Sequence, residues 1–177
     1  LHPYDRDHVI GLGKDTFDMG DFAWYQGVKV SLFDVSDVEH PQEESKIVIG
    51  DRGTHSTALY EHKAFLFVPA RGLLVLPIDL YLVNRTRNPN PPPEQSGELA
   101  WQGAYAISIS LGAEMTVVGR VAHNPGPGCP YDARSYSCYS YSVQRSLYIG
   151  DVLYTISLKW IILSALATFD EIGRIAL

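Results

Sequence analysis

The chain has 177 residues, of which 46% are hydrophobic and 19% are charged, and its formal net charge is −6. This composition suits one globular domain with a buried core, and it argues against a disordered chain or a small disulfide scaffold. The sequence has no lysine- and arginine-rich run, so nucleic acid is not expected as a partner. The longest apolar runs, such as residues 73–76, are far shorter than the roughly 18 residues of a membrane span, so no transmembrane segment is expected.

Short segments rich in β-branched and aromatic residues dominate the sequence. They are bounded by Gly, Pro, Asp, Asn or Ser, which is typical of strands separated by turns. Helical periodicity is not evident in any window of about a dozen residues. The sequence therefore predicts an all-β protein. The expected strands, in chain order, are residues 28–35, 63–68, 73–78, 104–109, 115–121, 152–156 and 160–163.

Two internal repeats relate distant parts of the chain. Residues 58–80 align without a gap on residues 146–168, and each copy is expected to form a strand, a tight turn and a second strand. A shorter repeat places Ser-Lys-Ile, Gly-Arg-Val and Gly-Arg-Ile at residues 45–47, 119–121 and 173–175. Without the Pro/Asn-rich insertion at residues 84–101, its period is about 54 residues, slightly above that of the usual propeller blade. The repeats favour a β-propeller of four-stranded antiparallel units, and a β-sandwich of repeated hairpins is the alternative.

Several motifs resemble those of a family of secreted archaeal and bacterial proteins whose C-terminal β-propeller is distantly similar to WD-repeat blades. The motifs are VSLFDVSD at residues 30–37, IVIGDRG at 47–53, HKAFLF at 62–67, WQGAY at 101–105 and RSLYIGDVLYTIS at 145–157. The proline-rich insertion and the Cys/Tyr/Ser segment depart from the family pattern. The resemblance implies a propeller fold and a secreted or cell-surface location, and it brings no catalytic residues.

About three blade-sized units fit into the chain, whereas propellers have about four to eight blades. The expected units are residues 1–57, 58–123 with the insertion at 84–101, and 143–177, with a Cys/Tyr/Ser loop at 125–142. Three twisted sheets do not close a ring. We therefore expect the chain, which begins at Leu1 rather than Met, to be the C-terminal portion of a larger propeller. Its expected partner is the remainder of that propeller, as a separate or adjoining polypeptide.

The Cys/Tyr/Ser loop contains two features with functional interest. Cys129 and Cys138 are predicted to form a disulfide, given the extracellular location that the resemblance implies, and two free thiols are the alternative. Tyrosines combined with serines are typical of contact loops, so this loop is a possible binding surface for protein or carbohydrate. The alternative is an insertion that packs on its own blade. The tyrosines concerned are Tyr131, Tyr136, Tyr139 and Tyr141.

Other polar residues give weaker signals. Asn84 begins the tripeptide Asn-Arg-Thr, an acceptor pattern for N-glycosylation. Asp15, Asp18 and Asp21 could bind calcium, but they lack the alternating pattern of a calcium loop and are expected to be solvated. The histidines, at positions 2, 8, 40, 55, 62 and 123, show no metal-ligand spacing, so no metal site is predicted from them.

Catalytic motifs are missing from the sequence. It contains neither a G-x-S-x-G nucleophile elbow nor a complete phosphate-binding loop. His62 and Asp151 are expected to tie loops to sheets. The preferred hypothesis is an extracellular structural or protein- or glycan-binding module without a cofactor. The alternative is an extracellular hydrolase, or the accessory domain of one, with a site at the propeller channel.

Overall fold

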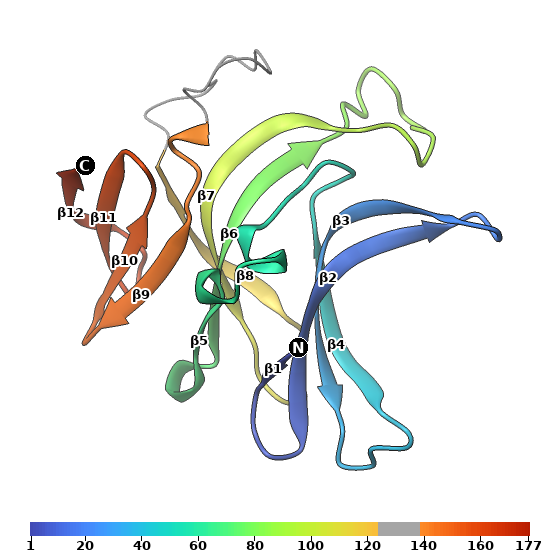
Figure 1. Cartoon of the computed structure of the whole chain (residues 1–177), viewed down its shortest axis with the longest axis horizontal. Coiled ribbons are helices and arrows are strands. Elements are labelled where there is room, and N and C mark those ends of the chain that lie inside the picture. The colour runs from blue at the N-terminus through green and yellow to red at the C-terminus, as the bar shows by residue number, and fades with distance from the viewer. Residues whose placement is uncertain (124–138) are drawn as a thin grey trace.

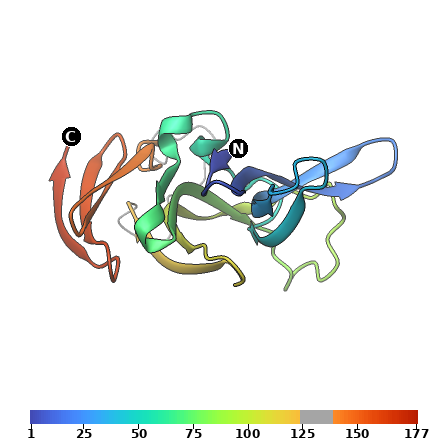
Figure 2. The ribbon, with the colours of Figure 1, turned by 90° about the horizontal axis from the view of Figure 1, so that it is seen from below.

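The computed structural model describes residues 1–123 and 139–177, and it shows three antiparallel sheets of four strands each. The sheets follow one another in chain order across the molecule (Figure 1), and they remain separate when viewed from below (Figure 2). Strands that are adjacent in the sequence pair within each sheet. The expectation of an all-β chain built from four-stranded antiparallel units is confirmed.

The strands have the following bounds. The first sheet contains β1 (His2–Pro3), β2 (His8–Asp18), β3 (Ala23–Asp34) and β4 (Gln42–Ile49). The second contains β5 (Leu66–Val68), β6 (Leu73–Leu82), β7 (Glu98–Ser108) and β8 (Thr116–Ala122). The third contains β9 (Arg145–Ile149), β10 (Val152–Ile156), β11 (Trp160–Ala165) and β12 (Glu171–Ala176). Short 3₁₀ turns precede and follow β5, namely η1 (Thr57–Leu59), η2 (His62–Ala64) and η3 (Pro69–Arg71).

One expected strand is shorter than the sequence suggested. Residues 63–68 were expected to be extended throughout, but only β5 is a strand. The side chain of Glu61 accepts a hydrogen bond from the backbone N–H of Lys63, which starts the 3₁₀ turn η2. A capping side chain of this kind competes with the extended conformation that the apolar residues prefer.

The core consists of two layers, one on each face of the second sheet. Val30 and Leu32 of the first sheet pack against Leu76 and Tyr105 of the second. On the opposite face, the second sheet packs against Leu153 and other residues of the third. Because both of its faces are covered, the second sheet contains an almost continuous apolar run in β6 instead of an alternating one.

Each sheet has a β-bulge at the same place in its fourth strand. Single residues are left unpaired in β4, β8 and β12, and they are Glu44, Val118 and Ile172. The residue after each bulge begins the short repeat at 45–47, 119–121 and 173–175. That repeat therefore marks equivalent positions in the three sheets. An extra residue bends its strand and increases its twist, so the bulges curve the three sheets alike.

The longer repeat, unlike the shorter one, does not relate equivalent strands of two sheets. Aligning residues 58–80 on 146–168 places β6 on β11, which are the second strand of one sheet and the third strand of the next. The two segments share an apolar strand pattern but do not occupy equivalent places. Two strands that pass through a packed core acquire similar sequences, whatever their order in the sheet.

The proline-rich insertion connects β6 to β7 and lies against the first sheet. The side chain of Gln26 donates a hydrogen bond of 2.9 Å to the carbonyl oxygen of Pro93. Arg85 pairs with both carboxylate oxygens of Asp51 at 2.7 Å. These contacts hold the insertion against β3 and against the turn that follows β4, and the insertion lies above the β2–β3 hairpin in Figure 1.

Candidate functional site

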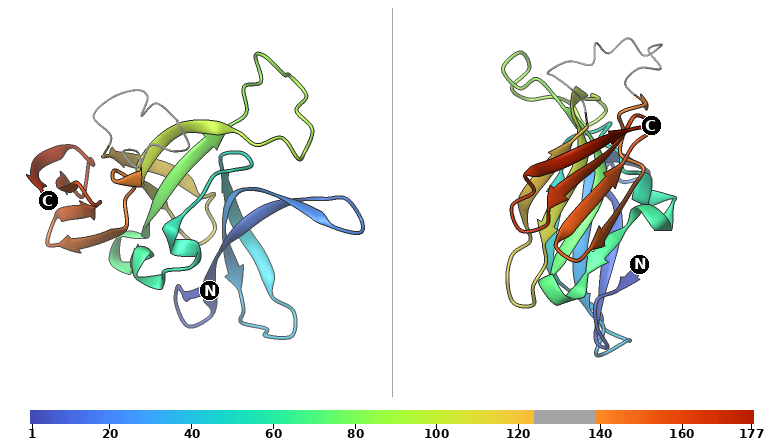
Figure 3. Two further views of the ribbon diagram at one scale, coloured as in Figure 1. Left: turned by 45° about the horizontal axis from the view of Figure 1, so that its top comes forward. Right: turned by 90° about the vertical axis from the view of Figure 1, so that its left-hand side faces the viewer.

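The outward side of the third sheet carries a continuous apolar surface. Strand residues alternate there, so that Leu153 and Ile162 point toward the second sheet and their neighbours point away from it. Ile149 is 65% exposed and Ile175 is 53% exposed. Figure 3 (right) shows this sheet in front of the other two. We define the outer apolar face as Leu147, Ile149, Val152, Tyr154, Ile156, Ile161, Leu163 and Ile175.

The equivalent surface of the second sheet is buried. In β7, Ala104 and Ala106 lie on either side of Tyr105, which pairs with Arg120 of β8. In β11, Ile161 and Leu163 lie in the same way on either side of Ile162, which pairs with Arg174 of β12. The two alanines are 1% and 2% exposed, because the third sheet covers them. The outer apolar face therefore corresponds to the side of the second sheet that the third sheet covers. In the third sheet, no described residue covers this side.

A glycine in each of two bulged strands gives the clearest comparison. A Cβ atom built at Gly119 would lie 1.9 Å from a ring carbon of Phe169, which belongs to the β11–β12 turn of the next sheet. Gly173 occupies the same place in β12, and a Cβ atom there would meet no atom of the described residues within 4 Å. Thus Gly119 accommodates a side chain from the following sheet, and the surface at Gly173 is open.

The outward side of the first sheet has a different chemistry. Glu43 forms ion pairs with Lys29 at 2.6 Å and with Lys46 at 3.0 Å, and it accepts a hydrogen bond of 2.7 Å from Ser31. The hydrogen bonds from Lys29 and Ser31 lower the pKa of Glu43 to about 2. These four side chains, which we call the Glu43 network, make this face polar where the outer apolar face is hydrophobic.

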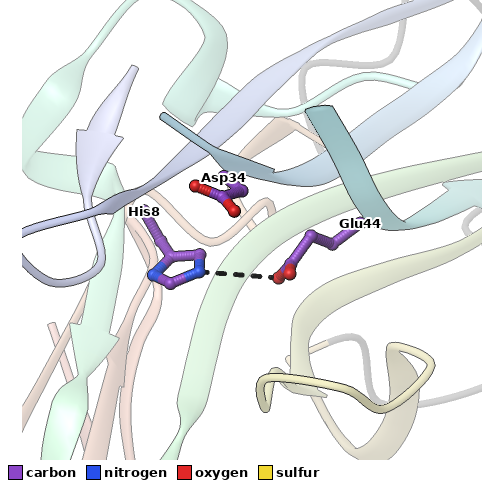
Figure 4. A group of neighbouring side chains, drawn as sticks. All are labelled: His8, Asp34 and Glu44. Atoms are coloured by element: carbon purple, nitrogen blue, oxygen red, sulfur yellow. Dashed lines mark ion pairs between the residues drawn. The ribbon is translucent and has the colours of Figure 1, made fainter. Parts of the chain in front are cut away.

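A second polar group lies at the other side of the first sheet. His8 and Asp34 are directly paired residues of β2 and β3, and Glu44 is the bulge residue of β4. Their potential ligand atoms all lie within 4.8 Å of one another (Figure 4). The Nδ1 atom of His8 is 2.8 Å from a carboxylate oxygen of Asp5, and its Nε2 atom is 3.7 Å from Glu44. The Asp5 hydrogen bond raises the pKa of His8, and the charges of Glu44 and Asp34 act in the same direction.

Comparison with known proteins agrees with this repeated arrangement of sheets. The family model described as the beta propeller domain matches residues 1–169. The chain belongs to this family. An uncharacterized protein of Archaeoglobus fulgidus is 32% identical over 77 residues, which make up 44% of this chain and 11% of that relative. No solved structure matches the chain. The propeller prediction and the family resemblance are confirmed.

Two polar residues in the interior of this propeller chain have shifted pKa values, the half-buried Asp79 and the buried His123. Asp79 in β6 accepts hydrogen bonds from Gln102 and from Ser142, and burial raises its pKa. His123, which follows β8, is 1% exposed and lies 2.7 Å from the hydroxyl of Thr155 in β10. Burial lowers the pKa of His123 to about 4. This histidine is therefore neutral at physiological pH where the second and third sheets meet.

The structure places several of the predicted site residues on the surface of the propeller. Asn84 is exposed in the β6–β7 connection, where its side chain accepts a hydrogen bond from the backbone of Arg87. Tyr139 is exposed and Tyr141 is half-buried. Glycosylation of Asn84 and ligand binding by these tyrosines stay predictions. The disulfide partners Cys129 and Cys138, and also Tyr131 and Tyr136, lie outside the described residues.

The remaining polar candidates have separate positions. Asp15, Asp18 and Asp21 do not belong to the group of potential metal ligands found in residues 1–123 and 139–177. Asp151 forms an ion pair with Arg71, which links the third sheet to η3 beside the second. His62 is exposed next to Glu61. No helix in the described part of the chain has the length and hydrophobicity that a membrane crossing requires.

The sequence did not predict the group formed by His8, Asp34 and Glu44. Its members are separated by 26 and 10 residues, so no local spacing identifies them. Strand pairing brings His8 to Asp34, and the bulge turns Glu44 toward both. The repeat at residues 45–47 marked the position of the bulge, but it gave no sign that the residue before it would approach a histidine.

Proposed function

We propose that this chain is a structural and binding part of a larger extracellular or cell-surface propeller, and that its outer apolar face binds a further blade. The observation that carries the proposal is the equivalence of this face to the buried side of the second sheet. A repeated sheet buries its faces against its neighbours, and each repeat depends on the next for its core.

The composition of the outer apolar face supports a stable contact. Its residues are aliphatic or aromatic in all four strands, and contiguous apolar patches on a surface mark interaction sites. Complete burial of a fully exposed side chain of this kind contributes about 1.5–3 kcal/mol, and these partly buried side chains would each contribute less. A covering sheet would therefore gain much of its binding free energy from this face.

The open surface at Gly173 supports a propeller blade as the occupant. The ring of Phe169 covers Gly119, and Met115, four residues before Gly119, lines the same cleft as Ser45 of the first sheet. Phe169 and Met115 both lie four residues before the residue that follows the bulge in their own sheets, so they occupy equivalent positions in the sequence of the repeated sheets. A blade with the same turn would cover Gly173 in the same way. The archaeal relative is much longer than the stretch that matches this chain, which is compatible with further blades.

A photo-crosslinking experiment tests the proposed contact in the protein as its source cells produce it. p-Benzoylphenylalanine replaces Tyr154, in the middle of the outer apolar face, and Tyr25, which is 63% exposed in the first sheet, serves as the control position. We expect position 154, but not position 25, to crosslink to a peptide of β-propeller sequence from outside these 177 residues. Crosslinks only to a second copy of this chain, or no crosslink from position 154, would overturn the proposal.

Cell fractionation tests the proposed location separately. We expect the protein in the medium or the cell envelope, which is the location implied by the resemblance to secreted proteins. Recovery in the cytoplasmic fraction alone would contradict that part of the proposal, and it would leave the contact between blades to be judged from the crosslinks.

A further inference from the structure

We propose that His8, Asp34 and Glu44 form a binding site for one divalent transition-metal ion of the zinc type. The three side chains come from three neighbouring strands and converge on one point in Figure 4. One imidazole nitrogen and two carboxylates are ligands that zinc accepts, at about 2.0–2.2 Å from the ion. The site is independent of the proposed contact between blades, which lies on the third sheet.

The imidazole of His8 is oriented for metal binding. A carboxylate only accepts hydrogen bonds, so the contact of 2.8 Å with Asp5 places the proton on Nδ1. When His8 is neutral, the lone pair of Nε2 is directed toward Glu44, and a metal ion would take the place of the proton that Nε2 carries in the charged form. This carboxylate–histidine arrangement is the one that orients metal-binding imidazoles and increases their basicity.

The distance between Nε2 of His8 and Glu44 also fits an ion between them. The two atoms are 3.7 Å apart, which exceeds the length of a hydrogen bond. In a tetrahedral site, two ligand atoms bound to one zinc ion are separated by roughly 3.4 Å. A small rotation of the Glu44 side chain would therefore bring both atoms to binding distance.

The carboxylates supply the negative charge that a cation needs. Asp34 is fixed by a hydrogen bond of 2.7 Å from the backbone N–H of Ser36 to its Oδ1 atom, which leaves Oδ2 as a ligand atom. Lys29 and Lys46 both pair with Glu43, and Lys46 lines the same cleft as Glu44. The surroundings of His8 are therefore acidic, with Asp5, Asp34 and Glu44 around one imidazole.

A cleft beside the proposed site reaches one of its three ligands. Glu44 lines a cleft of about 750 Å³ that also borders residues 112–115 of the second sheet. Three protein ligands leave a fourth position on a tetrahedral ion for water. The ion would join the ends of β2, β3 and β4, and we expect its main effect to be stabilisation of the first sheet.

Isothermal titration of the 177-residue chain with Zn²⁺, together with thermal unfolding, tests the site. We expect one zinc ion per chain in this site and a rise in melting temperature. His8→Ala and Glu44→Gln should each weaken binding at least tenfold, and Asp5→Asn should weaken it about tenfold through the orientation of His8. Ca²⁺ should not compete, because it prefers sites made only of oxygen ligands.

His40 provides a matched control. Its Nδ1 atom is 3.0 Å from Asp37, three residues away, as the Nδ1 atom of His8 is from Asp5, but His40 is not part of the group of potential ligands. His40→Ala should leave zinc affinity unchanged. The proposal is wrong if the chain does not bind zinc, if His8→Ala and His40→Ala weaken binding equally, or if binding persists unchanged in both His8→Ala and Glu44→Gln. Glu44→Gln keeps the test valid if His8→Ala fails to fold.

Discussion

The two outward faces of the molecule differ in chemistry although they belong to sheets of the same design. On the first sheet, the outward face holds the Glu43 network of charged and hydroxyl groups. On the third sheet, the outer apolar face is hydrophobic in every strand. Polar groups remain satisfied in water, whereas apolar groups gain free energy by leaving it.

The two faces therefore differ in how much free energy a neighbouring sheet would contribute by covering them. In the Glu43 network, one carboxylate pairs with two lysines, and these charged groups are favourably placed in contact with water. The outer apolar face corresponds to the side of the second sheet that the third sheet covers. Both sides include the glycine that follows the bulge, which is Gly119 in the second sheet and Gly173 in the third. The contact with a further blade is therefore expected at the third sheet, and substitutions on both sides of that sheet test this assignment.

The largest expected effect separates the two equivalent glycines. Gly119→Val should lower the free energy of unfolding by about 3 kcal/mol or more, because the new side chain would overlap the ring of Phe169. Gly173→Val should change it by less than about 0.5 kcal/mol in the 177-residue chain, since its surface is open. Urea unfolding of both variants measures the difference. Equal losses at the two positions would contradict the assignment of Gly119 as covered and Gly173 as open.

Acidification should weaken the covered interface between the second and third sheets. The pKa of His123 is about 4 in the folded chain and 6.5 without burial, so the unfolded state binds the proton more strongly. Stability is therefore complete above pH 6.5 and falls as the pH drops toward 4, by up to about 3 kcal/mol. Urea unfolding at several pH values measures this loss. In the variant His123→Gln, the loss of stability between pH 6.5 and 4 should be absent. An unchanged pH dependence in this variant would show that His123 does not cause the loss.

A smaller effect is expected at the polar face of the first sheet. Glu43→Gln removes the charge that pairs with Lys29 and Lys46, and it should cost about 1 kcal/mol because the network is partly exposed. The pKa of Glu43 is lowered to about 2, so its contribution is present above pH 4.5 and is lost as the pH falls toward 2. Chemical unfolding below pH 4.5 distinguishes this loss from that of His123. Matching curves for the variant and the wild type would show that the network does not stabilise the sheet.

The smallest effect on stability should come from the outer apolar face itself. Ile175→Lys should leave the free energy of unfolding of the 177-residue chain within about 0.5 kcal/mol, because the side chain is already half in water. The same change should abolish crosslinking from position 154 to a neighbouring blade. Crosslinks that survive the charge would place the contact elsewhere.

The sequence was most informative where apolar residues alternate or run continuously. The strands at residues 73–78 and 152–156 were evident because burial on both faces or one face leaves such patterns. In the long hairpin of β2 and β3, only residues 28–35 were expected as a strand. The strand β2 was not expected, since it carries Gly11, Gly13 and Asp18, which have low strand propensity.

Features that depend on contacts between sheets could not be predicted. The repeat at residues 45–47, 119–121 and 173–175 was visible, yet only the structure shows that Gly119 lies under Phe169, 50 residues further along the chain. The group around His8 likewise depends on strand register and on one bulge. A shift of a single residue in that register would turn its side chains to the opposite face.

An experimental structure of the protein as its source cells assemble it would show directly what covers the third sheet. We expect a further β-sheet packed on the outer apolar face, with an apolar side chain from its last turn in contact with Gly173. A structure in which Leu163 and Ile175 face solvent, or are covered only by a second copy of this chain, would contradict it.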